Sequence, residues 1–358
     1  MGEAGPGPGL WATMTRTSAG VSGEVVLRST LGHVDGEAVD LVRLVSDAGV
    51  EVDIIGLGAA VVGWRVPMAG GLRPVVLGSA ELGACLQRTE YLGCVVGRVA
   101  NRISGARFEV GGQWYSVDAN EGSTCLHGGR RGLSRQVWSL EVDRAACAVR
   151  ATHTSPHGAM GFPGRVAVQV TWRLEGYTLH FAVDAQPDRP TPISMTQHLY
   201  FNLDGGGTIR GHRLRVDADR TLVLDAHQCA TGTWEPVAGT GRDLRRLRLV
   251  APSDAPPALD HYFGFRPDRD PGRAPVVLAS ADAALALSLW TDRPGVQVYD
   301  GAFLAAGIPG WSGVGPWSGI CVEDQDPPGA TNHPYLGDVV CTPDRAYHHR
   351  SRIRIAPG

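Results

Sequence analysis

The clearest secondary-structure signal in the chain is the run Arg165-Val166-Ala167-Val168-Gln169-Val170-Thr171-Trp172-Arg173-Leu174. Larger apolar side chains alternate with polar or small ones, and successive side chains of a β-strand point to opposite faces of the sheet. The run therefore predicts a strand with one buried face. A turn follows at Glu175-Gly176, and Leu179, Phe181 and Val183 then alternate in the same way. Together the two runs predict an antiparallel hairpin.

Short apolar runs separated by turn residues occur along most of the chain. They predict further strands at 52–55, 61–64, 74–78, 285–289 and 352–355. No long stretch has the period of a helix, and Gly and Pro are numerous, at 48 and 24 residues. Pattern and composition together predict an all-β fold, a sandwich built from large antiparallel sheets.

The N-terminal end differs in composition from the rest. Residues 1–22 are rich in Gly, Pro, Ser and Thr, and we expect a flexible tail there. No composition break divides residues 23–356, which we expect to form a single domain. The Pro- and Asp-rich segments 252–257 and 266–275 are predicted surface loops, and the arginine cluster at 242–248, interleaved with leucines, is typical of a solvated strand or turn.

Charge and cysteine usage exclude several classes of partner. The net charge is −3 with a pI near 6.5, so the chain lacks the basic surface that nucleic acids or anionic membranes require. We find neither an apolar run of membrane-spanning length nor a secretory signal. The seven cysteines are scattered and odd in number, as expected for reduced thiols in a cytoplasmic protein. The sequence leaves open whether the protein is a monomer or a homodimer.

A carboxylate follows a hydrophobic run near the C-terminus. Ile320 and Val322 lead to Glu323, and the segment 326–329, with two prolines, cannot continue a strand. We therefore expect Glu323 at the end of a strand, where the sheet fixes its position and the loop leaves it accessible, as a general base requires. The structural alternative is a solvated carboxylate at the rim of the sheet.

Four further stretches combine unusual polar residues with strand-like runs. They are Gly97-Arg98-Val99-Ala100-Asn101-Arg102-Ile103, Cys125-Leu126-His127-Gly128-Gly129, Thr196-Gln197-His198-Leu199-Tyr200-Phe201-Asn202-Leu203 and Leu259-Asp260-His261-Tyr262-Phe263. Asn and Arg side chains suit a polyhydroxylated ligand, and a His among apolar neighbours has an easily shifted pKa. Each stretch alone is also explained by an ordinary role, such as a salt-bridged Arg, a His in a turn or in the core, or an Asp that caps a turn.

Taken in order, these motifs resemble those of the aldose 1-epimerase (galactose mutarotase) family. The matching residues are Gly97-Arg98-x-x-Asn101-Arg102-Ile103, Leu126-His127-Gly128-Gly129, His198-x-Tyr200-Phe201-Asn202-Leu203, Asp260-His261-x-Phe263, Gly295-Val296-Gln297-Val298-Tyr299, Glu323-x-Gln325 and Asn332-x-Pro334. The resemblance extends over residues 25–355. It implies a galactose mutarotase-like β-supersandwich with a carbohydrate-binding cleft across one sheet.

The resemblance also implies an activity that needs no cofactor, the interconversion of the α and β anomers of an aldohexose. Glu323 would be the base that removes the proton of the anomeric hydroxyl, and His198 the acid that protonates the ring oxygen. His127 and Arg102 would polarise these oxygens. The remaining expected substrate contacts are Asn101, Asp260 and Gln297.

The expected reaction moves a proton off one oxygen and onto another of the same molecule. It therefore needs two titratable groups, one ionised and one protonated. A Glu with an ordinary pKa of about 4.3 and a His near 6.5 meet this need close to neutral pH. With Glu323 ionised and His198 protonated, a nearby Asp260 would favour the imidazolium.

The sequence departs from the family pattern around several motifs. Gln197 and Leu199 flank the His, Asp300-Gly301-Ala302 replaces Thr-Gly-Asn, and Thr124-Cys125 replaces an Asn. The loop after Glu323 also lacks the usual Phe-Pro-Asp. Two alternatives therefore stay open. One is a repurposed enzyme that uses the same pair to eliminate water from, or isomerise, a different metabolite, and the other is a carbohydrate-binding module without turnover.

Metal binding would be a competing use of His and carboxylate residues. His348 and His349 are adjacent, and neighbours in a strand point to opposite sides. No His-x-His or His-x-x-x-His pair lies near the candidate acids, so we expect no metal.

Overall fold

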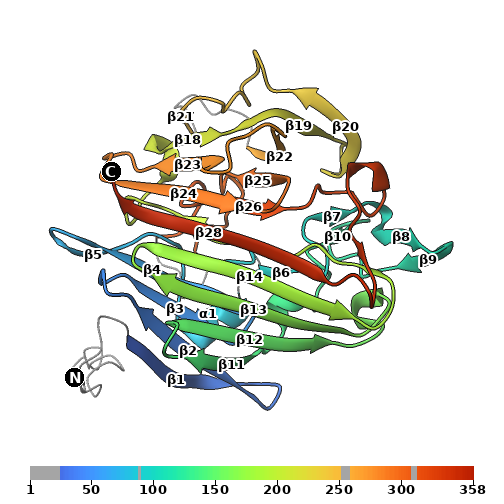
Figure 1. Ribbon diagram of the computed structural model, residues 1–358, viewed down its shortest axis with the longest axis horizontal. Coiled ribbons are helices and arrows are strands. Elements are labelled where there is room, and N and C mark those ends of the chain that lie inside the picture. Colours follow the sequence, from blue (N-terminus) through green and yellow to red (C-terminus); the bar gives the residue numbers. More distant parts are fainter. Residues whose placement is uncertain (1–24, 88–89, 251–258, 308–312) are drawn as a thin grey trace, which may run out of the picture.

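The computed structural model describes residues 25–87, 90–250, 259–307 and 313–358. Its largest element is a nine-stranded antiparallel sheet, in which β28 runs between β14 and β24 (Figure 1). The strand order is β11 (Ser139–Asp143), β12 (Ala148–Ser155), β13 (Val166–Glu175), β14 (Thr178–Pro187), β28 (Tyr347–Pro357), β24 (Leu285–Thr291), β23 (Val276–Ala279), β18 (Arg213–Val216) and β21 (Arg248–Leu249). This sheet forms one layer of the molecule.

The predicted hairpin lies within this sheet. Strands β13 and β14 pair antiparallel from Val166 opposite Pro187 to Glu175 opposite Thr178. On β13 the residues from Val166 to Leu174 alternate between buried and partly exposed, with Trp172 fully buried. The alternation in the sequence is therefore confirmed as the burial pattern of the sheet.

Two further antiparallel sheets face the first. The six-stranded sheet has the order β17 (Tyr200–Phe201), β26 (Ile320–Gln325), β25 (Gly295–Tyr299), β22 (Asp260–Phe265), β19 (Ala218–Leu224) and β20 (Ala230–Pro236). The five-stranded sheet has the order β1 (Val25–Val34), β2 (Glu37–Val45), β3 (Glu51–Ile55), β4 (Ala60–Met68) and β5 (Gly71–Pro74).

One large hydrophobic core joins the three sheets. It includes Val170 of the nine-stranded sheet, Val322 of the six-stranded sheet and Trp64 of the five-stranded sheet, all completely buried. Because each sheet contributes one apolar face to a shared interior, the expectation of a sandwich of large antiparallel sheets is confirmed.

Short elements connect the layers and carry several candidate residues. Two-stranded pairs are formed by β7 (Arg102–Ile103) with β10 (Cys125–Leu126), β6 (Val95–Val96) with β16 (Thr196–Gln197), β8 (Arg107–Val110) with β9 (Gln113–Ser116), and β15 (Thr191–Pro192) with β27 (Val340–Cys341). The only α-helix among the described residues is α1 (Leu82–Gln87). Short 3₁₀ turns lie at Ser104–Ala106, Leu133–Arg135, Ala159–Gly161, Ile209–Gly211 and Pro334–Leu336.

Two local predictions are corrected. The strand expected at 74–78 does not form, since β5 ends at Pro74 and only an isolated bridge joins Val76 to Phe201. Glu323 is not at a strand end, because β26 continues to Gln325 before the prolines interrupt it. It is also no solvated rim residue, as only 2% of its surface is exposed.

Other expectations agree with the described residues. All seven cysteines are buried and none forms a disulfide within the described residues, and segment 266–275 is a loop. The predicted loop at 252–257 and the tail at 1–22 lie outside the described residues. Among the helices that the structure describes, none is long and apolar enough to cross a membrane.

Candidate active site

The floor of the site is one face of the six-stranded sheet. In antiparallel pairing, residues directly opposite each other share a face. The register places Gln297 of β25 opposite both Glu323 of β26 and Tyr262 of β22. The adjacent row places Tyr299 opposite Cys321 and Asp260. Sheet register alone therefore brings a carboxylate from β26 close to an amide and a second carboxylate.

Glu323 projects from the middle of β26 into a hollow. Its Oε1 lies 3.7 Å from Nε2 of His198, and its buried Oε2 has no hydrogen-bond partner among the described residues. A buried carboxylate oxygen without a donor is unfavourable by several kcal/mol, of order 1–3 or more. Glu323 lines the hollow, so this oxygen is available to a hydrogen-bond donor that enters it.

His198 lies in the short connection between β16 and β17. Its main chain is held on both sides, because its N–H donates to the Cys94 carbonyl at 2.8 Å and its own carbonyl accepts from Gly93 N–H at 2.9 Å. Its Nδ1 contacts Cys321 Sγ at 3.5 Å, which leaves Nε2 facing Glu323. The imidazole is thus fixed in position with one nitrogen available to the hollow.

His127 follows β10 and is held by the segment that contains Asn101. The Asn101 N–H donates to His127 Nδ1 at 3.2 Å, and the His127 N–H donates to the Asn101 carbonyl at 3.1 Å. Because Nδ1 accepts a hydrogen bond, the neutral ring carries its proton on Nε2. The Asn101 side chain accepts from Arg102 N–H at 2.8 Å, so it shapes this loop as well as lining the hollow.

Charged groups form the polar wall of the hollow. Arg102 makes a two-pronged ion pair with Glu121, at 2.5 and 2.8 Å, and lies 3.9 Å from Asp260. Gln297 Nε2 donates to Asp260 Oδ1 at 2.6 Å. This arrangement holds donors and acceptors in fixed positions, which is what recognition of a polyhydroxylated molecule requires.

Aromatic rings form the rest of the wall. Tyr91 packs against His127 and His198, with ring centroids 4.6 and 5.8 Å away. Tyr299 stacks on Phe303, which is 74% exposed at the rim. Sequence analysis did not predict Glu121, Tyr91 or Phe303 as site residues. No local signal marks them, because they reach the hollow only through long-range packing.

The hollow has a volume of about 350 Å³, within the range of small-molecule sites. All seven residues predicted as catalytic or substrate-binding line it together. Its lining residues are Glu90, Tyr91, Asn101, Arg102, Glu121, Leu126, His127, His198, Tyr200, Asp260, Gln297, Tyr299, Phe303 and Glu323.

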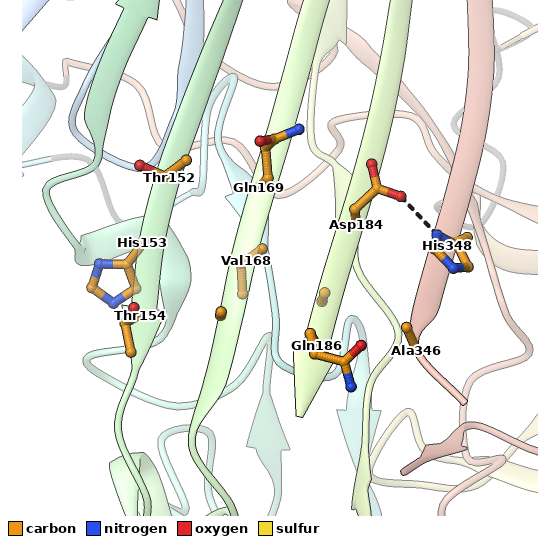
Figure 2. Close-up of a pocket in the computed structure, with 11 residues that line it drawn as sticks. Thr152, His153, Thr154, Val168, Gln169, Asp184, Gln186, Ala346 and His348 are labelled. Atoms are coloured by element: carbon orange, nitrogen blue, oxygen red, sulfur yellow. Dashed lines mark hydrogen bonds and ion pairs between the residues drawn. The ribbon is translucent and has the colours of Figure 1, made fainter. Parts of the chain in front are cut away.

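A larger hollow of about 450 Å³ lies on the outer face of the nine-stranded sheet (Figure 2). Its ion pair joins His348 to Asp184 at 2.7 Å, and the side chain of His348 is 62% exposed. Exposed ion pairs of this kind are strongly solvated. The smaller hollow differs from it in holding a buried carboxyl group and a buried imidazole side by side.

Burial shifts the acid–base pair toward its neutral forms. Burial lowers the pKa of His198 to about 4, and burial, with the nearby Asp260 as the next cause, raises the pKa of Glu323 well above its usual value. Burial therefore favours the uncharged forms, whereas the sequence predicts an imidazolium and a carboxylate at the start of the reaction. Asp260 raises the pKa of Glu323 and is not among the groups that shift His198.

Three potential metal ligands also meet here. Donor atoms of His127, His198 and Glu323 lie within 4.8 Å of one another, although sequence spacing gave no sign of it. The tautomer of His127 does not fit a metal, because its Nε2 keeps the proton while Nδ1 accepts from Asn101. The Arg102 guanidinium, one of the charges that lower the His127 pKa, also disfavours a cation. The set fits a neutral hydrogen-bonding ligand better.

The departures from the family pattern lie mostly outside this lining. Asp300 is buried and accepts main-chain hydrogen bonds from Leu259 and Ala302, at 3.0 and 3.1 Å. Gln197 and Cys125 are completely buried, and neither they nor Asp300 line the hollow. These substitutions therefore change the support of the site more than the surface that a ligand would touch.

Fold and hollow together define an all-β protein with a polar cleft over one sheet of a sandwich. The profile of the aldose 1-epimerase family matches residues 40–354. This match covers most of the chain, and the protein belongs to the aldose 1-epimerase family.

Characterised relatives agree with this assignment. The chain is 37% identical to galactose mutarotase of Rattus norvegicus over 341 residues, which cover 92% of this chain and 98% of the relative. It is 31% identical to aldose 1-epimerase of Escherichia coli strain K12 over 312 residues, covering 84% and 90% of the two chains.

Solved structures share the fold. An aldose epimerase homologue from C. elegans superposes with a TM-score of 0.81 at 25% identity, covering 87% of this chain and 96% of that one. Galactose 1-epimerase from Lactobacillus acidophilus gives a TM-score of 0.83 at 24% identity, with 94% and 99% covered. The galactose mutarotase-like architecture expected from the sequence is confirmed.

Proposed function

We propose that this protein is an isomerase that interconverts the α and β anomers of a free aldohexose, using only side chains of the hollow. The observation that carries the proposal is the pairing of Glu323 Oε1 with His198 Nε2 at 3.7 Å inside a polar cavity. This distance is too long for a direct hydrogen bond, which suits two groups that act on separate oxygens of a substrate.

In the proposed reaction, Glu323 takes the proton of the anomeric hydroxyl and His198 gives a proton to the ring oxygen. The C1–O5 bond breaks as the C1–O1 bond becomes a carbonyl, and rotation about C1–C2 turns the aldehyde. Reclosure reverses both transfers, as microscopic reversibility requires. While the sugar is open, Glu323 is protonated and His198 is neutral.

The same protonation state, a protonated Glu323 and a neutral His198, is the one that burial favours. The pair holds one proton in either arrangement, on Glu323 or on His198. A ring-closed sugar reacts once this proton is on the imidazole. Turnover therefore requires that Glu323 and His198 together hold one proton, which can lie on either residue.

The other lining residues would bind and polarise the sugar. His127 offers an Nε2 proton, and burial, with smaller electrostatic effects of His198 and Arg102, lowers its pKa well below the usual range, so it donates as a neutral ring. Arg102, held by Glu121, adds a fixed positive charge next to the oxygens. Asp260 and Gln297 would accept from and donate to hydroxyl groups, and Asn101 would mainly position His127.

The two alternatives are less well supported. A repurposed enzyme is expected to differ where the substrate touches, yet Gln197 and Asp300 do not line the hollow. A binding module has no use for an acid and a base that face each other in a buried cavity. The names of the relatives, galactose mutarotase and aldose 1-epimerase, also favour anomer interconversion.

Polarimetry on freshly dissolved α-D-galactose and α-D-glucose tests the proposal. The protein at micromolar concentration should speed the approach to the equilibrium rotation well above the buffer rate for at least one sugar. A rate equal to buffer for both would remove the mutarotase assignment. A cytoplasmic location, a single domain over 23–356 and a monomeric or homodimeric state stay predictions from the sequence.

A further inference from the structure

A buried ion pair lies directly behind the proposed active site. The two faces of β26 point to different environments, with Cys321 and Glu323 toward the hollow and Val322 in the core. Since side chains alternate along a strand, Asp324 points into the core. There it meets His349 of β28, which belongs to the facing nine-stranded sheet, and both residues are completely buried.

Both ring nitrogens of His349 face oxygen atoms. Its Nε2 lies 2.6 Å from Asp324 Oδ2, and its Nδ1 lies 3.1 Å from the Met195 carbonyl oxygen. Both partners are acceptors, so both ring nitrogens donate if Asp324 is ionised. Burial, the largest single effect, acts to raise the pKa of Asp324. The charge and hydrogen bond of His349, together with hydrogen bonds from Thr291 and Gln197, outweigh it and hold that pKa below the usual value.

Hydrogen bonds extend from this pair to the segments on both sides of the acid and the base. Thr196 Oγ1 donates to the Asp324 carbonyl at 2.8 Å. Gln197 Nε2 donates to the Val322 carbonyl at 2.8 Å and lies 3.4 Å from Asp324 Oδ1. Gln197, which precedes His198, therefore contacts both neighbours of Glu323. Met195 of the same segment contacts His349.

An ion pair in an apolar core is seldom more stable than apolar residues of the same size, because both charges lose their hydration. We therefore look for the role of the Asp324–His349 pair in how it positions neighbouring residues, and not in stability. We infer that Asp324 and His349 are positioning residues for the reaction proposed above: the pair joins β26, β28 and the segment 195–197 so that Glu323 and His198 keep their facing arrangement.

The same pair adds to the electrostatic setting of Glu323. The charge on Asp324 raises the pKa of Glu323, after the larger effects of burial and Asp260 and against that of Arg102. The titratable and charged groups packed around Glu323 come from several elements; they are Arg102, His127, His198, Tyr200, Asp260, Tyr299, Cys321 and Asp324. Removal of the Asp324 charge should shift the alkaline limit of activity toward lower pH.

The test compares Asp324→Asn and Thr196→Val with a matched exposed pair. Asp324→Asn removes the negative charge with little change in side-chain shape. Thr196→Val removes the hydrogen bond from Thr196 Oγ1 to the Asp324 carbonyl and leaves the ion pair in place. We expect kcat to fall roughly 10-fold for Asp324→Asn and about 3-fold for Thr196→Val, with KM within about 2-fold, since misplaced groups slow the chemical step. Asp184→Asn breaks the exposed ion pair between Asp184 of β14 and His348 of β28, the residue next to His349 (Figure 2), and should leave both constants unchanged.

A pH profile and a double variant separate positioning from a general loss of stability. Asp324→Asn should move the alkaline limb to lower pH, whereas Thr196→Val should not. The double variant Asp324→Asn/His349→Gln should lose no more activity than Asp324→Asn alone, because the pair acts as a unit. If Asp324→Asn does not fold, as judged by circular dichroism, Thr196→Val decides.

Wild-type kcat and KM in Thr196→Val, or in a folded Asp324→Asn with an unshifted pH profile, would overturn the positioning role. That outcome differs from failure of the proposed function, in which the wild-type protein itself gives no acceleration on any aldohexose offered.

Discussion

At the scale of single residues, the chemistry depends on how burial divides one proton between two side chains. Glu323 and His198 are 2% and 5% exposed, so each prefers its uncharged form. The neutral forms are a protonated carboxyl and an unprotonated imidazole, which together hold one proton. Adding a second proton or removing the only one leaves the pair unable to act as acid and base together.

The pH profile of kcat/KM reports this condition for the free enzyme. We expect a broad plateau around neutral pH, because the pKa of His198 is lowered to about 4 and that of Glu323 is raised. Activity should fall below about pH 4, where the imidazole takes a second proton, and at alkaline pH, where the pair loses its proton. A decline centred near pH 6.5, typical of a solvated His, would contradict the assignment.

At the scale of elements, glycines let the loops around the site approach other backbone segments. Gly128 follows His127 and has a φ of +87°, and a Cβ placed there would lie 2.0 Å from the Gly97 carbonyl oxygen. Gly176, in the turn between β13 and β14, also has a positive φ, of +53°, but has open space around it. Substitution at Gly176 therefore measures the cost of the left-handed conformation alone, whereas substitution at Gly128 adds a steric clash.

We expect Gly176→Ala to cost about 1 kcal/mol of unfolding free energy, the usual penalty for a left-handed conformation, with normal activity. Gly128→Ala should cost roughly 3 kcal/mol, because overpacking adds to that penalty, and should reduce kcat by displacing His127. Urea denaturation and polarimetry measure the two effects. Equal stability and activity of the two variants would show that the close approach of Gly128 does not matter.

The sequence predicts half-exposed strands better than it predicts the ends of fully buried ones. Alternation on β13 and β14 predicts the strands because one face is exposed, whereas every residue of β26 from Ile320 to Gln325 is buried and no alternation marks its end. The expected strand end at Glu323 was placed too early for this reason.

The candidate site depends on contacts that local sequence does not encode. His127, His198 and Glu323 come from three separate motifs, and only the resemblance to a family indicated that they meet. Tyr91, Glu121 and the Asp324–His349 pair lacked even that signal, because their positions follow from long-range register and from packing between sheets.

At the scale of the whole molecule, buried histidines make stability depend on pH. An unfolded chain protonates His198 near pH 6.5, whereas the folded protein does so only near pH 4. Between these pH values the unfolded state therefore binds more protons than the folded state. This difference in proton binding lowers the free energy of unfolding as pH falls. The lowering of the His198 pKa from 6.5 to about 4 corresponds to about 3 kcal/mol of unfolding free energy.

The variant His198→Asn should lack this contribution. Between pH 7 and pH 4.5 we expect the wild-type protein to lose roughly 2–3 kcal/mol more unfolding free energy than the variant, measured by urea denaturation. Identical losses in the two proteins would mean that His198 is free to take up a proton in the folded state.

In the proposed reaction, Glu323 and His198 exchange one proton with a sugar across a shared hollow. The most direct test of this proposal is NMR exchange spectroscopy on an equilibrated α/β mixture of D-galactose, or of D-glucose if polarimetry selects it, with wild-type protein and with Glu323→Gln and His198→Asn. The wild-type protein should speed exchange between the anomers, and each folded variant should lower that acceleration at least 100-fold, the lower part of what general acid–base catalysis contributes at its catalytic groups. Full acceleration in either folded variant would show that Glu323 and His198 are not the acid–base pair of the reaction.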